Sequence, residues 1–340
     1  MTLQERGPSV VDIVDRQSSK PDWNSPHSEK PHWVQKPAVA NAPSQSQMQG
    51  EAPAAVSSMQ QREPQALRNT IIRTYTIEHL KADPKLLYDI VEAYRYVFGG
   101  DPWNEWKVCS SCKAKCGRVE HQTMETDDCG SCGTGRLVDF HSPLEVKNRL
   151  FAELTMPGAA PFLFVAEAPA NHTGNRVLGF TWGYSLSCEH ITEHILGGYF
   201  AELQKDVALL TAARILSGMW TESATGDATY ISEVGVVENA RGSTLLFAQM
   251  LQAMAEQQVA LGYSTWVLWT SRQSRAFPLS MLLGGKPLFN VSDVLQGDDR
   301  LLLTGDCSEY LDICNKYPND KMVSYFIKAA RSMKTVFAAK

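Results

Sequence analysis

The sequence TYISEVGVVENARGSTLLFAQMLQAMAEQQVALG, residues 229–262, decides the fold of this chain. Residues 230–237 are rich in β-branched and aromatic side chains and predict a strand. A short polar turn follows, and from Thr244 onward apolar residues recur at helical spacing. The first backbone N–H groups of such a helix have no internal partners and attract phosphate. Gly242 allows a ligand to approach the backbone and Arg241 adds positive charge, so this stretch predicts an anion-binding strand–turn–helix unit.

The segments that follow extend this unit into a resemblance to a known family. Residues 265–270, TWVLWT, predict the next strand. The order resembles the GNAT superfamily of acyl-CoA N-acyltransferases, whose fourth strand ends in Val-x-Pro-x-x-Arg/Gln-Gly-x-Gly-x-Gly/Ala and which later carry Asn-x-x-Ala-x-x-Leu-Tyr-x-x-x-Gly-Phe. The matching residues are Val236, Arg241, Gly242, Ala276, Leu279 and Gly284. The departures are Glu238 for Pro, Thr244 and Leu246 for glycines, Gln273 for Asn, and Ser280 for Tyr.

The resemblance implies an α/β (α+β) fold with a mixed, mostly antiparallel central sheet flanked by helices. It also implies a site for the co-substrate acetyl-CoA. The pantetheine arm would bond to the strand backbone at Val234, Val236 and Val237, and an N–H near Val234 would stabilise the oxyanion. The other implied cofactor-binding residues are Arg241, Gly242, Ser243, Thr244, Leu245 and Gln273. Leu246 faces either the cofactor or the core, and its helical spacing with Met250 favours the core.

Three residues are candidates for catalysis. Tyr230 occupies the strand position that often holds the general base in this family. Glu233 has the opposite parity, so it faces the other side of the sheet unless a β-bulge, which is common in this strand, shifts it. The alternative for Glu233 is a strand-face carboxylate paired with a basic residue. Ser280 replaces the tyrosine that commonly protonates the departing thiolate, although ordered water serves instead in many members.

A second pattern predicts a metal site. Cys109-Ser-Ser-Cys112 and Cys129-Gly-Ser-Cys132 form a C-x2-C…C-x2-C array, in which each pair presents two thiolates to one tetrahedral Zn²⁺. Four cysteine ligands leave no open position for a water, so the zinc is structural. Cys116 and His121 are alternative ligands. Charges between residues 107 and 136 nearly balance and aromatic residues are not interleaved with them, which argues against a nucleic-acid finger.

Composition restricts the class of protein. The chain has 340 residues, 44% hydrophobic residues and a formal net charge of −5, which gives no general attraction to nucleic acid. No run reaches the roughly 18 apolar residues of a membrane helix, and no apolar segment of a secretory signal is present near the N-terminus. Five of the eight cysteines lie between residues 109 and 132, which favours metal binding over disulfides. We therefore expect a soluble cytoplasmic protein without a membrane partner.

The predicted organisation has four parts. Residues 1–69 form a disordered tail that is poor in large aliphatic side chains. Residues 70–306 form the GNAT-like domain, with the zinc ribbon inserted at 107–137. Residues 307–340 form a helical C-terminal extension with helices at 308–314 and 321–337. Within the domain, the expected strands are 71–77, 161–167, 176–184, 286–291 and 300–304, and the expected helices are 84–98 and 142–154, with Ser142 as N-cap.

Three further features of the sequence bear on the acceptor and on possible partners. Residues 187–226 are an insertion near the acceptor side, helical over 195–219, and its His190-Ile-Thr-Glu193-His194 resembles an inverted zinc-protease motif without a third ligand. Trp103 and Trp106 are either acceptor-pocket walls or packing beneath the ribbon. In the tail, Lys20-Pro-Asp-Trp23 and Lys30-Pro-His-Trp33 repeat ten residues apart, which suggests a pair of docking motifs for a protein partner.

Two functions of different classes follow. The first is N-acetylation of an unidentified amine, small or peptidyl, by acetyl-CoA. The second is a catalytically inactive GNAT-fold binding or scaffold protein that acts through its tail and its zinc ribbon.

Overall fold

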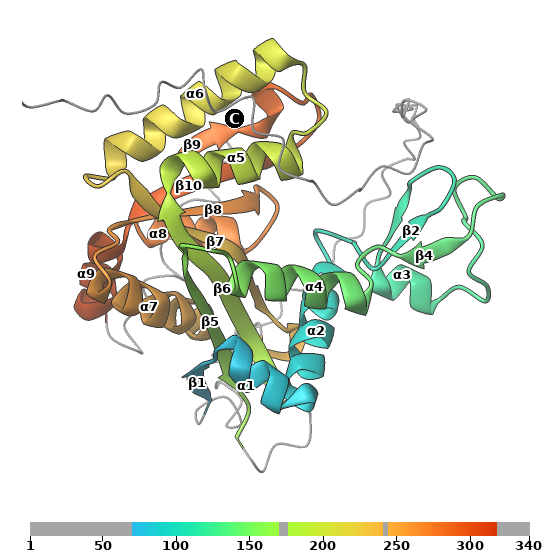
Figure 1. The fold of residues 1–340 in the computed structure, drawn as a ribbon. Coiled ribbons are helices and arrows are strands. Elements are labelled where there is room, and N and C mark those ends of the chain that lie inside the picture. Colours follow the sequence, from blue (N-terminus) through green and yellow to red (C-terminus); the bar gives the residue numbers. More distant parts are fainter. Residues whose placement is uncertain (1–69, 170–175, 241–243, 318–340) are drawn as a thin grey trace, which may run out of the picture. The chain divides into compact units, whose positions relative to one another are not determined.

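The computed structural model describes residues 70–169, 176–240 and 244–317, and its centre is a seven-stranded sheet in the order β1-β5-β6-β7-β8-β10-β9 (Figure 1). The strands are β1 (Ile71–Thr74), β5 (Ala160–Glu167), β6 (Val177–Ser187), β7 (Asp227–Val236), β8 (Thr265–Ser271), β9 (Lys286–Asn290) and β10 (Arg300–Asp306). Only the β7–β8 pair is parallel among these neighbours. The predicted mixed, mostly antiparallel α/β sheet is confirmed.

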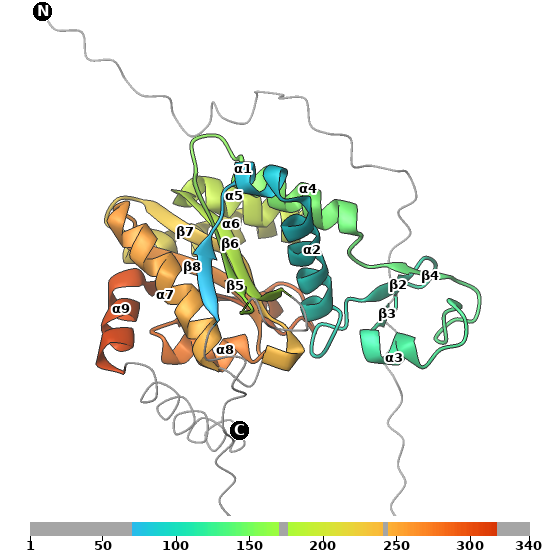
Figure 2. The ribbon, with the colours of Figure 1, turned by 90° about the horizontal axis from the view of Figure 1, so that it is seen from below.

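Helices cover both faces of this sheet (Figures 1 and 2). One face packs against α2 (Pro84–Phe98), α4 (Pro143–Leu154), α5 (Cys188–Tyr199) and α6 (Lys205–Glu222); the other packs against α7 (Thr244–Ala260) and α9 (Cys307–Lys316). The connections contain α1 (Ile77–Ala82), η3 (Glu238–Ala240), α8 (Ala276–Leu282) and η4 (Val291–Asp293). β6 separates the two layers: Trp182 and Tyr184 are buried under the first set, whereas a Cβ at Gly179 would meet Met250 of α7.

Local sequence explains where the helices begin. In α4, the Ser142 hydroxyl accepts the amide N–H of Glu145, and the Glu145 carboxylate accepts the amide N–H of Ser142. These two bonds complete a capping box. Pro143 occupies the first turn, where its missing N–H costs nothing. The predictions for α4 and for α2, whose N-cap is Asp83, are therefore confirmed.

Two predicted elements were wrong in extent. The strand expected over 71–77 ends at Thr74, because α1 begins at Ile77 with Thr76 in its capping box. The single helix expected over 195–219 is two helices, α5 and α6. Phe200 ends α5 and is buried against the rings of Trp269 and Phe289, so the break is made by tertiary packing that helical periodicity does not show.

The ribbon insertion is a three-stranded sheet, in the order β3-β2-β4, with one short helix. Its elements are β2 (Lys107–Cys109), β3 (Lys115–Cys116), α3 (Arg118–Gln122) and β4 (Leu137–Asp139). Asp139 bonds Arg95 of α2 and Lys107, each at 3.0 Å, and the Arg95 guanidinium lies 5.0 Å from the Trp106 ring centre. Trp106 therefore packs beneath the insertion, whereas Trp103 lines a cavity of about 500 Å³ between the end of α2 and α3.

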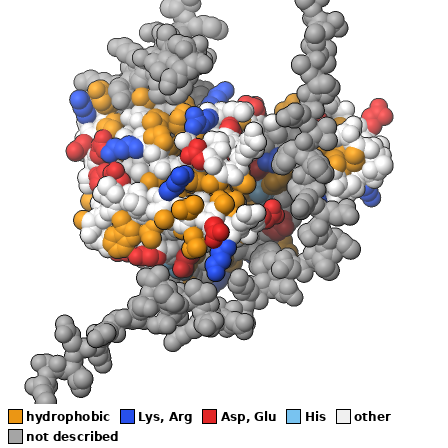
Figure 3. Space-filling model, turned by 90° about the horizontal axis from the view of Figure 1, so that it is seen from above, with side chains coloured by type: hydrophobic (Ala, Val, Ile, Leu, Met, Phe, Trp, Pro, Cys, Tyr) orange, Lys and Arg blue, Asp and Glu red, His pale blue; other side chains and the backbone are white. Residues whose placement is uncertain are grey.

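Two observations concern the outside of the molecule. None of the described helices is long and apolar enough to cross a membrane. On the described surface in Figure 3, Lys and Arg side chains are interspersed with Asp and Glu, so this face shows no continuous basic track for a phosphate backbone. The expected helix at 308–314 corresponds to α9, while the helix at 321–337 and the Trp23/Trp33 tail lie outside the described residues.

Candidate active site and metal centre

A buried polar network lies where α4 crosses β7. Arg149 of α4 donates to Glu233 of β7, to Ser232 Oγ at 3.2 Å and to Glu153 Oε1 at 3.3 Å. The other oxygen of Glu153 accepts the indole N–H of Trp182 at 2.9 Å, and Ser232 Oγ donates to Glu153 at 2.8 Å. Each carboxylate is thus held by at least one donor in the interior.

The charge of this network is unbalanced. Two carboxylates face one guanidinium, so the group carries a net negative charge when both are ionised. The Glu153 and Glu233 side chains are 4% and 8% exposed, but the Arg149 side chain is 34% exposed and connects them to the surface. Burial raises the pKa of Glu233 to about 7, against the opposing charge of Arg149. A carboxyl with this pKa can exchange a proton near neutral pH.

Aromatic side chains surround the network on the same face of the sheet. The Tyr94 hydroxyl accepts from Arg149 at 3.3 Å. A second aromatic group consists of Tyr184, Tyr230 and His194, whose rings contact one another with centroid distances of 5.6 to 5.8 Å. The buried Tyr184 hydroxyl has no hydrogen-bond partner among the described residues, and burial lowers the pKa of His194. These residues form a largely buried polar and aromatic cluster between α4, α5 and β7.

A β-bulge brings Glu233 to this face. Gly183 of β6 pairs with Ile231 and the adjacent Trp182 pairs with Glu233, so Ser232 is the extra residue. Tyr230 packs with the α5 and α6 residues and Ile231 with those of α7, as alternation requires. The bulge restarts the alternation, and Glu233 lies on the face of Tyr230. Glu233 also pairs with Arg149. The two alternatives considered for this residue, a bulge that shifts its orientation and a carboxylate paired with a basic residue, are therefore both present.

Beyond the bulge the sheet opens between its two parallel strands. β7 and β8 pair only over Ala228–Ile231 and Thr265–Leu268. Further along, β7 remains bonded to β6, with Val234 opposite Thr181 and Val236 opposite Gly179, and β8 remains bonded to β10. The facing edge of β7 after Ile231 therefore offers backbone groups to a ligand that adds to it as an extended chain.

These features decide the fold: one parallel strand pair that separates after a bulge, and a turn into a long helix at the end of the bulged strand. The described chain has a GNAT-like fold. In the order of its sheet, β7 is the fourth strand and β8 is the fifth.

Comparison with known proteins finds only distant structural likenesses. The structure is similar to a mosquito arylalkylamine N-acetyltransferase-like 5b (11% identity, TM-score 0.40, covering 70% of this chain and 100% of that one). It is also similar to an agmatine N-acetyltransferase mutant (12%, 0.41, 70% and 99%) and to PaiA N-acetyltransferase from Thermoplasma acidophilum in complex with coenzyme A (9%, 0.35, 70% and 99%). No family model matches the chain, and no curated protein matches its sequence. These likenesses are too distant to define the chemistry of this chain.

The predicted cofactor residues line the opening or follow it. Val234 and Val236 are half-buried on β7, and the amide of Val237 bonds the carbonyl of Leu178 at 3.0 Å. α7 begins at Thr244, and Leu245 is half-buried in its first turn. Gln273 is exposed just past the end of β8. Arg241, Gly242 and Ser243 lie outside the described residues.

The structure gives the positions of two residues, Leu246 and Ser280, that differ from the GNAT motifs. Leu246 is 2% exposed and packs in the core cluster that contains Met250 of α7 together with residues of α2 and α4, so it faces the core and not a cofactor. Ser280 of α8 is also buried, and its hydroxyl has no hydrogen-bond partner among the described residues. The enclosed Ser280 hydroxyl is poorly placed to give a proton to a thiolate that arrives from outside.

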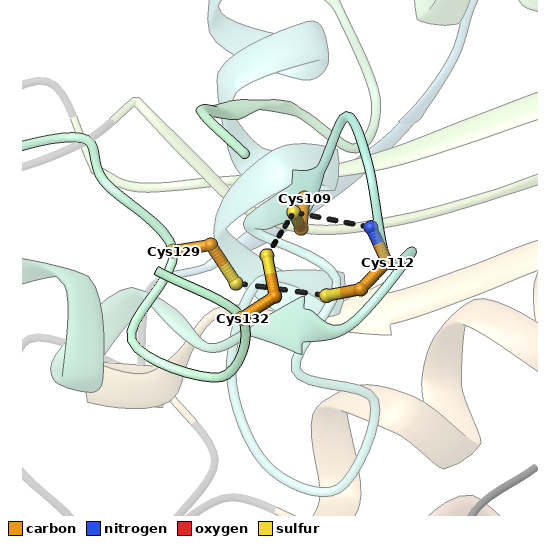
Figure 4. A group of neighbouring side chains, drawn as sticks. All are labelled: Cys109, Cys112, Cys129 and Cys132. Carbon is orange, nitrogen blue, oxygen red and sulfur yellow. Dashed lines mark hydrogen bonds between the residues drawn. The ribbon is translucent and has the colours of Figure 1, made fainter. Parts of the chain in front are cut away.

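The four predicted cysteines form a compact cluster (Figure 4). Their Sγ atoms all lie within 4.8 Å of one another, and the Cys109–Cys132 and Cys112–Cys129 pairs are each 3.7 Å apart. Tetrahedral zinc with Zn–S bonds of about 2.3 Å requires sulfur atoms about 3.8 Å apart. The amides of Ser111 and Cys112 donate to the Cys109 sulfur at 3.4 Å, and a Cβ on Gly135 would meet that sulfur at 2.3 Å. The set fits one Zn²⁺.

The alternative zinc ligands are engaged elsewhere. Cys116 contacts the carbonyl of Gly117 and the sulfur of Met124, and His121 bonds Asp127 at 2.8 Å. Among the residues that the structure describes, only the four cysteines form a group able to hold a metal. His190 and His194 of α5 therefore have no third ligand there, and His194 belongs to the aromatic group beside Tyr230.

Reasoning from the sequence missed Arg149 and Glu153. Their i, i+4 spacing in an amphipathic helix is typical of a surface ion pair. The sequence did contain a signal for their inward orientation, because both residues lie on the side of α4 that carries the apolar Val146 and Leu150.

Proposed function

We propose that this protein is an N-acetyltransferase that moves an acetyl group from acetyl-CoA to an amine. One observation carries the proposal: the bulged strand that opens away from β8 also presents Glu233 beside that opening. A carboxyl whose pKa is about 7 then lies on the strand that an acyl donor would bind.

Different residues of the chain have different roles in the proposed reaction. The edge of β7 at Val234, where the strand has separated from β8, bonds the extended arm of the donor, and the first amides of α7 receive its pyrophosphate. Acetyl-CoA, when bound, supplies the acyl group as an activated thioester. A backbone N–H near Val234 stabilises the oxyanion, and Glu233 takes the proton from the amine directly or through a water. Arg149 holds Glu233 in place.

The charge of the network supports an amine as acceptor. An amine arrives protonated at neutral pH, and the excess carboxylate of the Glu153–Glu233 pair attracts it. Ser280 is left out of this scheme, so water protonates the departing thiolate.

We further propose that the cysteine cluster holds structural Zn²⁺. The amides of Ser111 and Cys112, which donate to the Cys109 sulfur, favour a thiolate at that position. The ion orders an insertion whose buried core contains few apolar side chains.

The experiment is calorimetric titration of the full chain with acetyl-CoA. We expect binding, and we expect Gly242→Asp to abolish it because a carboxylate in the turn repels pyrophosphate. Gly197→Asp, a matched change at an exposed glycine of α5 with open space around it, should bind like wild type. If wild type shows no binding at millimolar acetyl-CoA, the enzyme proposal fails and the scaffold function takes its place.

A further inference from the structure

The ribbon reaches the cofactor side of the sheet through one side chain. Arg118 is the first residue of α3, and its Nη2 atom donates to Glu238 Oε2 at 2.6 Å. Glu238 begins η3, which follows β7 directly and precedes the predicted anion-binding turn and α7. This ion pair joins two segments that are 120 residues apart in the sequence.

Arg118 is built into its place. The residue is only 8% exposed, although arginine is rarely so buried without a partner. Its guanidinium carbon lies 4.0 Å from the ring centre of Tyr96 of α2, and its backbone N–H donates to the carbonyl of Gly99 at 2.7 Å. One residue of the ribbon therefore contacts both the end of α2 and the end of β7.

The position of Arg118 depends in turn on the cysteine cluster. Cys109 lies in β2, and β2 pairs with β3, which ends at Cys116, two residues before Arg118. Four thiolates within 4.8 Å repel one another unless a cation lies between them. Metal binding therefore fixes β2 and β3, and with them the start of α3.

The partner residue has a clear electrostatic role. Glu238 stands where the family has proline, so it places a carboxylate at the head of a turn that is to receive an anion. Arg118 pairs with that carboxylate, whose side chain is 65% exposed, and offsets its charge. Without Arg118, the negative charge would remain beside the incoming pyrophosphate.

We propose that Arg118 is a positioning residue through which the zinc-loaded ribbon sets the acyl-donor side of β7, so that zinc and CoA each strengthen the binding of the other. This inference rests on the proposed function, because it assumes that CoA binds after β7. It makes the ribbon part of the donor site and not only a local stabilising element.

The test measures, on the full chain, how the binding of Zn²⁺ and the binding of CoA affect each other. CoA affinity is measured by calorimetry before and after zinc removal, in wild type, Arg118→Ala and Arg136→Ala. Arg136 is the matched control, because it is an exposed arginine of the same ribbon. Zinc removal should weaken CoA binding about fivefold or more in wild type and in Arg136→Ala. In Arg118→Ala, CoA binding should be weak already and insensitive to zinc.

A reciprocal measurement avoids the zinc-free chain, in case that form unfolds. Linkage requires that saturating CoA raise zinc affinity by the same factor, measured by competition with a chelator, in wild type but not in Arg118→Ala. In turnover, Arg118→Ala should raise the KM for the acyl donor and leave that for the amine unchanged. If wild type binds CoA and the zinc effect is absent or equal in Arg118→Ala, the coupling alone is overturned. If wild type binds no CoA, the proposed function falls as well.

Discussion

Glu233 is the residue on which the proposed chemistry depends most. Its carboxyl is buried with Glu153 beside one arginine, and its pKa of about 7 is above the ordinary carboxyl value of 4.5. The base must be ionised to accept a proton, so kcat/KM should rise as pH increases through about 7. Glu233→Gln should lower kcat/KM about 100-fold and remove this rise, as measured by a pH–rate profile. An unchanged profile in Glu233→Gln would assign the base to another group.

The same pKa predicts a pH-dependent stability. Between pH 4.5 and about 7, the folded chain keeps a proton on Glu233 that the unfolded chain has lost. The free energy of unfolding contributed by this group therefore falls as pH rises through that window. Urea denaturation at several pH values should show a smaller fall in Glu233→Gln than in wild type.

Leu246 replaces a glycine of the family motif, and its location separates a packing role from a cofactor role. Because its side chain is buried in the α2–α4 cluster, Leu246→Ala should reduce the free energy of unfolding by about 3 kcal/mol. CoA affinity of the folded fraction should stay within twofold of wild type. A large loss of CoA affinity without destabilisation would show that the side chain faces the ligand.

At the scale of elements, Arg149 ties α4 to β7. Arg149→Ala leaves Glu153 and Glu233 buried without a counter-charge, and it should reduce the free energy of unfolding by about 3 kcal/mol. Lys147→Ala removes an exposed positive charge from the same helix and should change stability by about 0.5 kcal/mol or less. Denaturant titration compares the two variants. Equal effects would contradict a structural role of the network.

At the scale of the molecule, the ribbon is an insertion with its own small core, held together by the four cysteines. Cys112→Ser should abolish zinc binding and expose the ribbon to protease, while the sheet keeps its secondary structure. Cys116→Ala, which removes a buried thiol of the same ribbon outside the cluster, should retain one zinc per chain. Metal analysis of both proteins checks this. Loss of zinc in Cys116→Ala would bring back the alternative ligand set.

The tail remains a prediction at this scale. We propose that Trp23 and Trp33 anchor a protein partner, since each follows a Lys-Pro dipeptide in a ten-residue repeat.

Sequence patterns that act locally were sufficient for most of the framework. Spacing defined the cysteine pairs, the capping box defined the start of α4, and β-branched residues followed by a polar turn defined the β7–α7 unit. Each of these depends on residues near one another in the chain, and their side-chain chemistry shows directly in the sequence.

The tertiary structure decided the rest, because it depends on which segments meet. The extra residue at Ser232 becomes visible only when β7 is aligned with β6, and it turns Glu233 toward Arg149. Leu246 could face the cofactor or the core until α7 was placed against the sheet. The ion pair of Arg118 with Glu238 joins an insertion to a strand end that no local pattern relates to it. The sequence by itself thus determined most of the elements and the four clustered cysteines, whereas long-range packing determined which charges share the site.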